Sequence, residues 1–288
     1  MEQLTKNILG IFGEKGQLWL ANLPNIVNTL SEHWELRNLT PVDNMTFHYV
    51  AKAQTLSNQD VVLKISCDSK LTKDEKASLE YFDGCGSIRL IDYNEKYNAL
   101  LLQQAIPGIV LKSFYPMQVE FVIDCYTTTI QKLHKPLVGE HDNPHISDWL
   151  KSLNKANQLP KHLLKKAIDL KDKLLASPTQ QIFLHGDLHH DNILQHNNEW
   201  LAIDPKGIIG ELEFELAAFD FIHSSELEKG LNIKALLEER VEHISQNMKC
   251  DAQRVKDWIF VRLMLSAAWW MEDRGDPSIN IKLANSLF

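Results

Sequence analysis

The most chemically informative stretch of the chain is HGDLHHDNIL, which runs from His185 to Leu194. It places Asp187 and Asn192 five residues apart in a predicted loop between two short apolar runs, and a further carboxylate follows at Asp204. Carboxylate and amide oxygens are hard ligands of the kind that Mg²⁺ prefers, and a carboxylate can also accept a proton. The residue types and their spacing therefore indicate a site that handles a metal ion, a proton or both.

A predicted β-hairpin brings the two metal-binding candidates together. Residues 193–195 and 200–203 are mostly apolar and flank the polar turn 196–199, which is the pattern of two short antiparallel strands. Because a hairpin returns its second strand beside its first, Asp204 after the second strand should lie near Asn192 before the first. These two side chains could hold Mg²⁺, which leaves Asp187 for another role.

A lysine and a glutamate upstream complete the pattern. Residues 35–65 predict a meander of three strands with Lys64 in the third, and residues 69–82 predict a helix that carries Glu75. A strand lysine is most often a charge at a sheet edge. Together with the downstream loop, a strand lysine that pairs with a helix glutamate indicates that the lysine binds the α- and β-phosphates of ATP.

Phosphoryl transfer uses all of these parts. A catalytic-loop Asp orients the attacking hydroxyl and accepts its proton, and an Asn five residues later and a following Asp hold magnesium. The segment from Gln103 to Ile106 could present backbone groups to an adenine. A metal-dependent phosphoesterase is the alternative, since the loop is dense in His and Asp, but no upstream Asp-x-His or downstream Asn-His cluster accompanies it.

The turn at Pro107-Gly108 divides a strand-rich part from a helical part and predicts an α+β fold. We expect an N-terminal nucleotide-binding lobe at 1–105 and a helical catalytic and substrate lobe at 106–288. The first part should hold a leading helix with Pro24 in its first turn, the meander, the helix 69–82 and strands at 88–93 and 97–103. The second part should hold helices at 116–134, 147–157, 160–176, 210–224, 233–248, 252–273 and 277–287.

Composition narrows the class of protein. The 288 residues carry a formal charge of −8, with 44% hydrophobic and 24% charged residues, which is ordinary for a globular protein. The absence of a long basic run disfavours a nucleic-acid partner, and no apolar run is long enough to span a membrane. The four cysteines are far apart and read as reduced thiols, so we expect a cytoplasmic protein. Oligomeric state is not encoded in any of these features.

The chain resembles a known family of kinases. HGDLHHDNIL with IDP after it is similar to the HGDxxxxN…D signature of aminoglycoside-phosphotransferase-type kinases. The stretches EKASLEYFDGCGSIRLIDY, ALLLQQAIPG and WLAIDPKGIIGELEFELAAF resemble the aminoglycoside 6-phosphotransferase (streptomycin kinase) and hydroxyurea-resistance kinase family. The resemblance runs roughly from residue 35 to 223 and implies a two-lobed, protein-kinase-like fold with a small β-rich lobe and a larger, mainly helical one.

The resemblance assigns roles to individual positions. It implies Asp187 as the catalytic base, Asn192 and Asp204 as Mg²⁺ ligands, and the pair Lys64 and Glu75 on the phosphates of ATP. It further implies that Ala105 provides a backbone contact to the nucleotide, next to Gln103, and that His185 orients the loop.

Two features depart from or extend the pattern. The first hairpin lacks the glycines of a phosphate-covering loop, so that function would fall to Asn44 and Thr46. In the family, acids of the C-terminal lobe face cationic acceptors, which makes Glu211, Glu272, Asp273 and Asp276 the predicted substrate contacts. The implied acceptor is a small cationic or polar molecule, by resemblance streptomycin. A metabolic kinase of the choline, homoserine or sugar-alcohol type would carry the same motifs and remains open.

Overall fold

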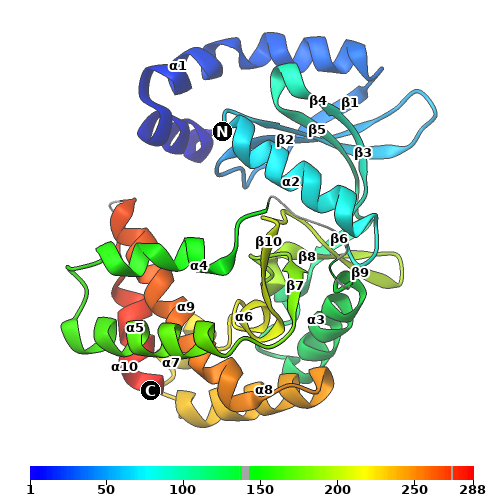
Figure 1. Cartoon of the computed structure of the whole chain (residues 1–288). Coiled ribbons are helices and arrows are strands. Elements are labelled where there is room, and N and C mark those ends of the chain that lie inside the picture. The colour runs from blue at the N-terminus through cyan, green and yellow to red at the C-terminus, as the bar shows by residue number, and fades with distance from the viewer. Residues whose placement is uncertain (136, 138–142, 274) are drawn as a thin grey trace. The chain divides into compact units, whose positions relative to one another are not determined.

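The computed structural model describes residues 1–135, 137, 143–273 and 275–288 (Figure 1). The chain divides into two compact units, of which the first comprises Met1–Gly108 with Gln195–Leu201 and the second comprises Ile109–Leu194 with Ala202–Phe288. A sheet-based first unit and a mainly helical second unit confirm the predicted fold class. The first unit also includes residues 195–201, which the sequence did not predict.

The first unit is built on a five-stranded antiparallel sheet with the strand order β1-β2-β3-β5-β4. The predicted three-stranded meander and the two later strands are confirmed. Their bounds are β1 (Arg37–Pro41), β2 (His48–Gln54), β3 (Asp60–Ser66), β4 (Leu90–Asn94) and β5 (Ala99–Gln103), with a short 3-10 turn η1 (Glu95–Tyr97) between the last two.

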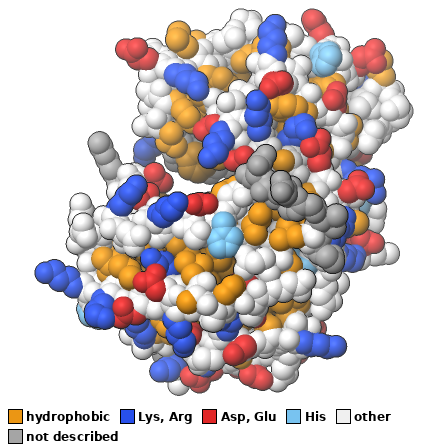
Figure 2. Space-filling model, in the orientation of Figure 1, with side chains coloured by type: hydrophobic (Ala, Val, Ile, Leu, Met, Phe, Trp, Pro, Cys, Tyr) orange, Lys and Arg blue, Asp and Glu red, His pale blue; other side chains and the backbone are white. Residues whose placement is uncertain are grey.

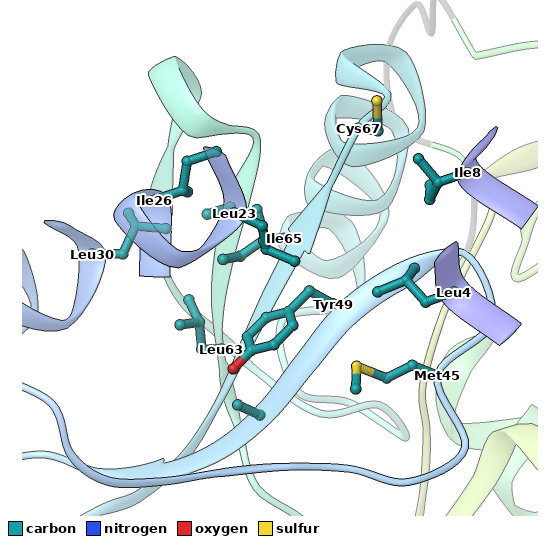
Figure 3. Packing of buried hydrophobic residues seen from close by; sticks show 12 residues of the cluster. Leu4, Ile8, Leu23, Ile26, Leu30, Met45, Tyr49, Leu63, Ile65 and Cys67 are labelled. Carbon is teal, nitrogen blue, oxygen red and sulfur yellow. The ribbon is translucent and has the colours of Figure 1, made fainter. Parts of the chain in front are cut away.

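Helices α1 (Glu2–His33) and α2 (Ser69–Phe82) pack against the sheet. Side chains alternate between the faces of a strand, so Leu63 and Ile65 of β3 point to one face and Lys64 to the other. Leu63 and Ile65 belong to the hydrophobic cluster that α1 covers (Figure 3). Lys64 meets Glu75 of α2, which means that the two helices cover opposite faces of β3.

The leading helix is longer than predicted. It begins at Glu2, and Pro24 lies inside it instead of in its first turn. Gly13, with φ 52° and ψ −126°, interrupts the helical geometry at a position that only glycine adopts easily. The early part escaped detection because apolar side chains such as Ile11 and Leu18, 56% and 72% exposed, blur the apolar face.

Helix α2 has the bounds that the sequence predicts. Its N-terminus is capped by Asp68, whose carboxylate accepts hydrogen bonds from the backbone N–H groups of Lys70 and Leu71. Its C-terminus is closed by Asp83 in the left-handed conformation, one residue before the predicted terminator Gly84. Capping at both ends fixes the start and end of the helix that carries Glu75.

The second unit contains most of the predicted helices and corrects two of them. The span 147–157, predicted as one helix, forms the short α-helix Ile146–Trp149 and then a 3-10 helix, Leu150–Lys155. The span 210–224, predicted as one helix, instead forms a strand and a short helix, and a further short helix follows it. The helices are α3 (Val119–Leu133), α4 (Ile146–Trp149), α5 (Lys161–Ala176), α6 (Leu212–Leu216), α7 (Ser224–Glu228), α8 (Ile233–Met248), α9 (Ala252–Glu272) and α10 (Ser278–Leu287). The 3-10 turns are η2 (Leu111–Phe114), η3 (Leu150–Lys155) and η4 (His190–Asn192).

Two small sheets accompany these helices. One pairs β7 with β10 and the other has the order β6-β8-β9. Their strands are β6 (Pro107–Val110), β7 (Gln181–Leu184), β8 (Ile193–His196), β9 (Glu199–Ala202) and β10 (Ile208–Glu211). The predicted hairpin is therefore present as β8 and β9.

Two observations concern the helices and the molecular surface. Among the described residues, no helix is long and apolar enough to cross a membrane. Acidic and basic side chains are interspersed over the face in Figure 2 and do not gather into a basic stripe there.

Candidate active site

The loop that carries the HGDLHHDNIL motif is held at both ends by a pair of strands. Strands β7 and β10 are antiparallel, and Leu184 pairs with Ile208, so the segment between them, which includes the β8-β9 hairpin, has fixed ends. The backbone N–H groups of Lys206 and Gly207 donate to the carbonyl oxygen of His185 at 2.8 and 3.3 Å. The start and the end of the loop are thus joined directly beside the strands.

His185 is fully buried and orients the loop, as the family resemblance implies. Its Nε2 lies 2.8 Å from the carbonyl oxygen of Ile203, and its Nδ1 accepts a hydrogen bond from the backbone N–H of Asp187 at 3.3 Å. This pair of contacts requires the neutral tautomer with the proton on Nε2. Burial lowers the pKa of His185 to about 4, so the ring remains neutral at neutral pH.

Asp187 has a fixed backbone and a partly exposed carboxylate. Its side chain is 39% exposed, and its oxygens lie 3.8 Å from Nζ of Lys206 and 3.9 Å from Nε2 of His189. Its N–H is held by His185, and its carbonyl oxygen accepts a hydrogen bond from Nδ2 of Asn192 at 2.9 Å. A carboxylate presented in this way can accept the proton of a bound hydroxyl group.

The predicted metal ligands lie at the two ends of the hairpin. Asn192 uses its Nδ2 on the Asp187 carbonyl, so its Oδ1 is the oxygen that it can offer to a cation. The backbone N–H of Ile203 donates to the carbonyl oxygen of Asn192 at 2.9 Å, which brings the adjacent Asp204 close to Asn192. Asp204 has a left-handed backbone with φ 60°. An amide oxygen and a carboxylate from adjacent strand ends fit the donor set that Mg²⁺ takes.

Two buried charged residues that the sequence did not reveal brace Gly186. Its N–H donates to both carboxylate oxygens of Glu215 at 3.0 and 3.2 Å, and its carbonyl oxygen accepts from Nη2 of Arg262 at 3.2 Å. Burial raises the pKa of Glu215 to about 7. The only sequence signal is a glutamate inside the apolar run FELAAF, and such a residue needs a buried partner.

A cluster of His and Asp side chains includes three residues of the loop itself. Atoms of His189, His190, Asp191 and Asp220 that could bind a metal lie within 4.8 Å of one another. Nζ of Lys112 already lies 2.5 Å from Asp191 and 3.8 Å from Asp220. The ammonium group thus provides the positive charge between these two acids.

The predicted ion pair of the first unit is present. Nζ of Lys64 lies 2.8 Å from Oε1 and 2.7 Å from Oε2 of Glu75, and both side chains are buried. The edge-strand interpretation of Lys64 is wrong, because β3 lies in the middle of its sheet. The Lys64–Glu75 ion pair is therefore part of the interior of the first unit and not a surface contact.

The remaining predicted nucleotide contacts occupy different environments. Asn44 and Thr46 are exposed in the turn before β2, and the carbonyl oxygen of Thr46 accepts from Asn7 at 3.0 Å. Gln103 ends β5, with its Oε1 accepting from the N–H of Arg89 at 3.1 Å. Ala105 is buried two residues further along.

The four predicted substrate acids separate into two groups. Glu211 is 1% exposed, and its carboxylate is bonded to Arg254 at 2.7 Å, to Thr179 at 2.8 Å and to the indole N–H of Trp258. These contacts occupy the carboxylate of Glu211, which argues against a contact with the substrate. We infer that Glu211 instead holds α9 in place through Arg254 and Trp258. The other three are exposed near the end of α9, and they are Glu272, Asp273 and Asp276.

Comparison with known proteins agrees with this geometry. Residues 33–274 match the family described as aminoglycoside/hydroxyurea antibiotic resistance kinase. The chain is 23% identical to streptomycin 6-kinase of Streptomyces griseus over 270 residues, which cover 91% of this chain and 87% of that protein. It is 30% identical to streptomycin 3''-kinase of Klebsiella pneumoniae over 210 residues, which cover 69% of this chain and 77% of that protein. It is 23% identical to hydroxyurea phosphotransferase of Kitasatospora aureofaciens over 272 residues, which cover 91% of this chain and 77% of that protein.

Solved structures share the fold at low sequence identity. Choline kinase LicA from Streptococcus pneumoniae superposes with a TM-score of 0.65 at 16% identity, covering 92% of this chain and 98% of that one. A ternary complex of aminoglycoside phosphotransferase APH(4)-Ia with ADP and hygromycin B gives a TM-score of 0.64 at 11% identity, covering 90% and 96%. The predicted protein-kinase-like fold is confirmed.

Proposed function

The chain belongs to the aminoglycoside/hydroxyurea antibiotic resistance kinase family, and on that premise we propose that it transfers the γ-phosphate of ATP to a hydroxyl group of a small polar acceptor with the help of Mg²⁺. Streptomycin is the first acceptor to test, because three curated relatives are named as kinases of that antibiotic. The family membership also removes the phosphoesterase alternative.

The observation that carries the proposal is the fixed, partly exposed carboxylate of Asp187. His185 and Asn192 hold the backbone of Asp187 on both sides, so its carboxylate needs little reorganisation to meet a hydroxyl group. We propose that Asp187 orients that hydroxyl and accepts its proton during in-line attack on the γ-phosphorus.

The nucleotide side follows from the other predicted residues. Asn192 and Asp204 would hold Mg²⁺, which supplies positive charge for the phosphate oxygens. Lys64, oriented by Glu75, would bind the α- and β-phosphates, and Gln103 and Ala105 would lie by the adenine. Asn44 and Thr46 remain our proposal for the turn that covers the phosphates.

The test is a coupled assay of ADP release by the purified protein. The acceptors should include streptomycin, other aminoglycosides, hydroxyurea, choline and sugar alcohols, each with and without Mg²⁺. Stimulation by streptomycin above the acceptor-free rate supports the antibiotic kinase, and stimulation by choline or a sugar alcohol alone supports the metabolic alternative. A rate that no acceptor changes would refute the proposal.

A further inference from the structure

A cavity of about 200 Å³ lies against Asp187 inside the second unit. Its walls come from the segment 217–222 after α6 and from α9 and α10. The volume is below the roughly 300–1,000 Å³ of pockets that enclose drug-sized ligands. The cavity therefore suits one part of an acceptor better than a whole antibiotic of several rings.

Three buried polar atoms in this lining have no hydrogen-bond partner among the described residues, and one of them, Nδ1 of His189, lies 3.4 Å from a carboxylate oxygen of Asp191. The other two are Nη1 of Arg262, which can only donate, and Oδ1 of Asn280, which can only accept. An unpaired buried polar atom costs about 1–3 kcal/mol, so most such atoms in native proteins have a partner. A ligand that carries both a hydrogen-bond acceptor and a hydrogen-bond donor would pair with Nη1 of Arg262 and Oδ1 of Asn280 at once.

Two contacts fix the orientation of Arg262 and leave its Nη1 without a partner. Its Nη2 donates to the carbonyl oxygen of Gly186, and its guanidinium lies over the ring of Phe214 at 4.6 Å. The remaining lining is mixed. It has the polar residues Asp187, His189, Asp220 and Ser266 together with aliphatic side chains, among them Leu263 from α9 and Leu283 and Leu287 from α10. Aliphatic side chains of this kind pack well on the C–H faces of a saturated ring.

We propose that this cavity binds one saturated, polar ring of the acceptor, with Arg262 and Asn280 bonded to hydroxyl or amino substituents on that ring. The proposal rests on the kinase function proposed above and deepens it by naming the ring-binding residues. Arg262 also ties recognition to catalysis, because the same guanidinium holds Gly186, the residue before Asp187. Asn280 is a specificity residue, whereas Arg262 is both a specificity and a positioning residue.

The test compares two asparagines of α10. Asn280→Leu removes the unpaired oxygen with little change in side-chain shape, and Asn285→Leu is the matched control, since Asn285 is exposed and contacts His162 and Ile281. Steady-state kinetics would use streptomycin, or whichever acceptor the panel identifies. Binding of 2-deoxystreptamine, a single-ring probe, would be followed by saturation-transfer NMR without ATP.

We expect Asn280→Leu to raise the acceptor KM by about 5- to 150-fold, the equivalent of one lost hydrogen bond, with kcat and the KM for ATP nearly unchanged. The NMR signal of 2-deoxystreptamine should disappear in Asn280→Leu and remain in Asn285→Leu. Asn280→Asp keeps an accepting oxygen and should retain binding. Arg262→Lys, which keeps the charge and loses the second donor, should change kcat and KM together.

Specific outcomes overturn the inference. An unchanged acceptor KM in Asn280→Leu, or equal losses in both leucine variants, would exclude Asn280 from acceptor recognition. If no acceptor stimulates ADP release, the proposed function fails, yet the NMR experiment still tests the cavity because it needs no turnover. Absence of 2-deoxystreptamine binding to the wild-type protein would refute the ring-binding proposal itself.

Discussion

The backbone N–H of Gly186 donates to the buried carboxylate of Glu215, at 3.0 Å from Oε1 and 3.2 Å from Oε2. Gly186 precedes the proposed base, and Glu215 belongs to the short helix α6, so this contact fixes the catalytic loop to the interior of the second unit. Tyr126 adds to the brace by donating to the carbonyl oxygens of Leu188 and Glu215 at 3.0 and 3.3 Å. The loop is thus positioned by backbone contacts that leave the Asp187 carboxylate available.

Glu215 should give the protein a characteristic pH dependence of stability. Its pKa is about 7 in the folded state against an ordinary value of 4.5, so between these pH values the folded state binds more protons than the unfolded state. Stability from this group is therefore lost as the pH rises through that window. We expect the free energy of unfolding of wild type, relative to Glu215→Gln, to fall by about 3 kcal/mol from pH 4 to pH 8. Denaturant unfolding at several pH values measures this difference, and a constant difference would contradict the assignment.

Replacement of the proposed base should affect chemistry and spare nucleotide binding. Asp187→Asn keeps the shape and the backbone contacts of Asp187 but cannot accept a proton. We expect kcat to fall by about 10²- to 10⁴-fold, the usual contribution of a general base, with the Kd for ATP nearly unchanged. Single-turnover kinetics and calorimetric titration with a non-hydrolysable ATP analogue would separate the two effects. Retained turnover would refute the role of Asp187.

The buried ion pair of Lys64 and Glu75 can be compared with the more exposed ion pair of Lys76 and Glu80, which serves as its control. Lys64→Ala leaves the buried Glu75 without its ammonium partner, which typically costs about 3–5 kcal/mol, and it should also raise the KM for ATP. Lys76→Ala removes an i,i+4 partner of Glu80 whose side chains are 31% and 51% exposed, and it should cost about 0.5 kcal/mol or less. Equal effects of the two substitutions on unfolding and on the KM for ATP would exclude a special role for Lys64.

Loss of the proposed metal ligands should raise the requirement for Mg²⁺. Asp204→Asn is the cleaner variant, because asparagine tolerates the left-handed backbone at φ 60° while the charge is removed. We expect the Mg²⁺ concentration for half-maximal rate to rise by at least about 10-fold, the size of a 1.4 kcal/mol loss. Asn192→Leu should act similarly and also loosen the Asp187 backbone. Asp169→Asn, at an exposed position of α5, is the control, and a matching rise there would invalidate the comparison.

Among the acids that the sequence suggested for the substrate, the buried Glu211 should behave differently from the exposed Glu272 and Asp273. Glu211→Gln disrupts the contacts with Arg254 and Trp258 and should lower the melting temperature without a selective change in acceptor KM. Glu272→Gln and Asp273→Asn should leave the melting temperature unchanged. A selective rise in acceptor KM for these two variants would establish them as acceptor contacts, and an unchanged KM would remove them.

Local sequence predicted the parts of the fold in which local signals and tertiary packing agree. Residues 69–82 have an apolar periodicity and a turn at the end, and α2, which Asp68 caps at its N-terminus, has those bounds. Residues 210–224 have helical apolar spacing, yet the start of this span forms β10 because it pairs with β7. The partner strand lies far away in the sequence, so no window of local sequence contains the competing contact.

The difference between local sequence signals and contacts distant in sequence also applies to the candidate active site. Asp187, Asn192 and Asp204 could be found because a motif and a hairpin keep them close in sequence. The brace from Glu215 and Arg262 and the unpaired oxygen of Asn280 could not, since these residues reach the loop from helices later in the chain. Their types are ordinary, and only the folded chain reveals that they are buried and where they point.

The pairing of Leu184 with Ile208 also has a consequence for stability. The proposed base and both proposed metal ligands lie within one segment whose ends these strands join, so the strand pair holds all three in one part of the second unit. Gly210 of β10 is a sensitive position in that pair, because a Cβ there would lie 2.5 Å from Cγ2 of Ile146 and 2.8 Å from Cδ1 of Leu184. Gly210→Ala should therefore lower the melting temperature while touching none of the reacting groups.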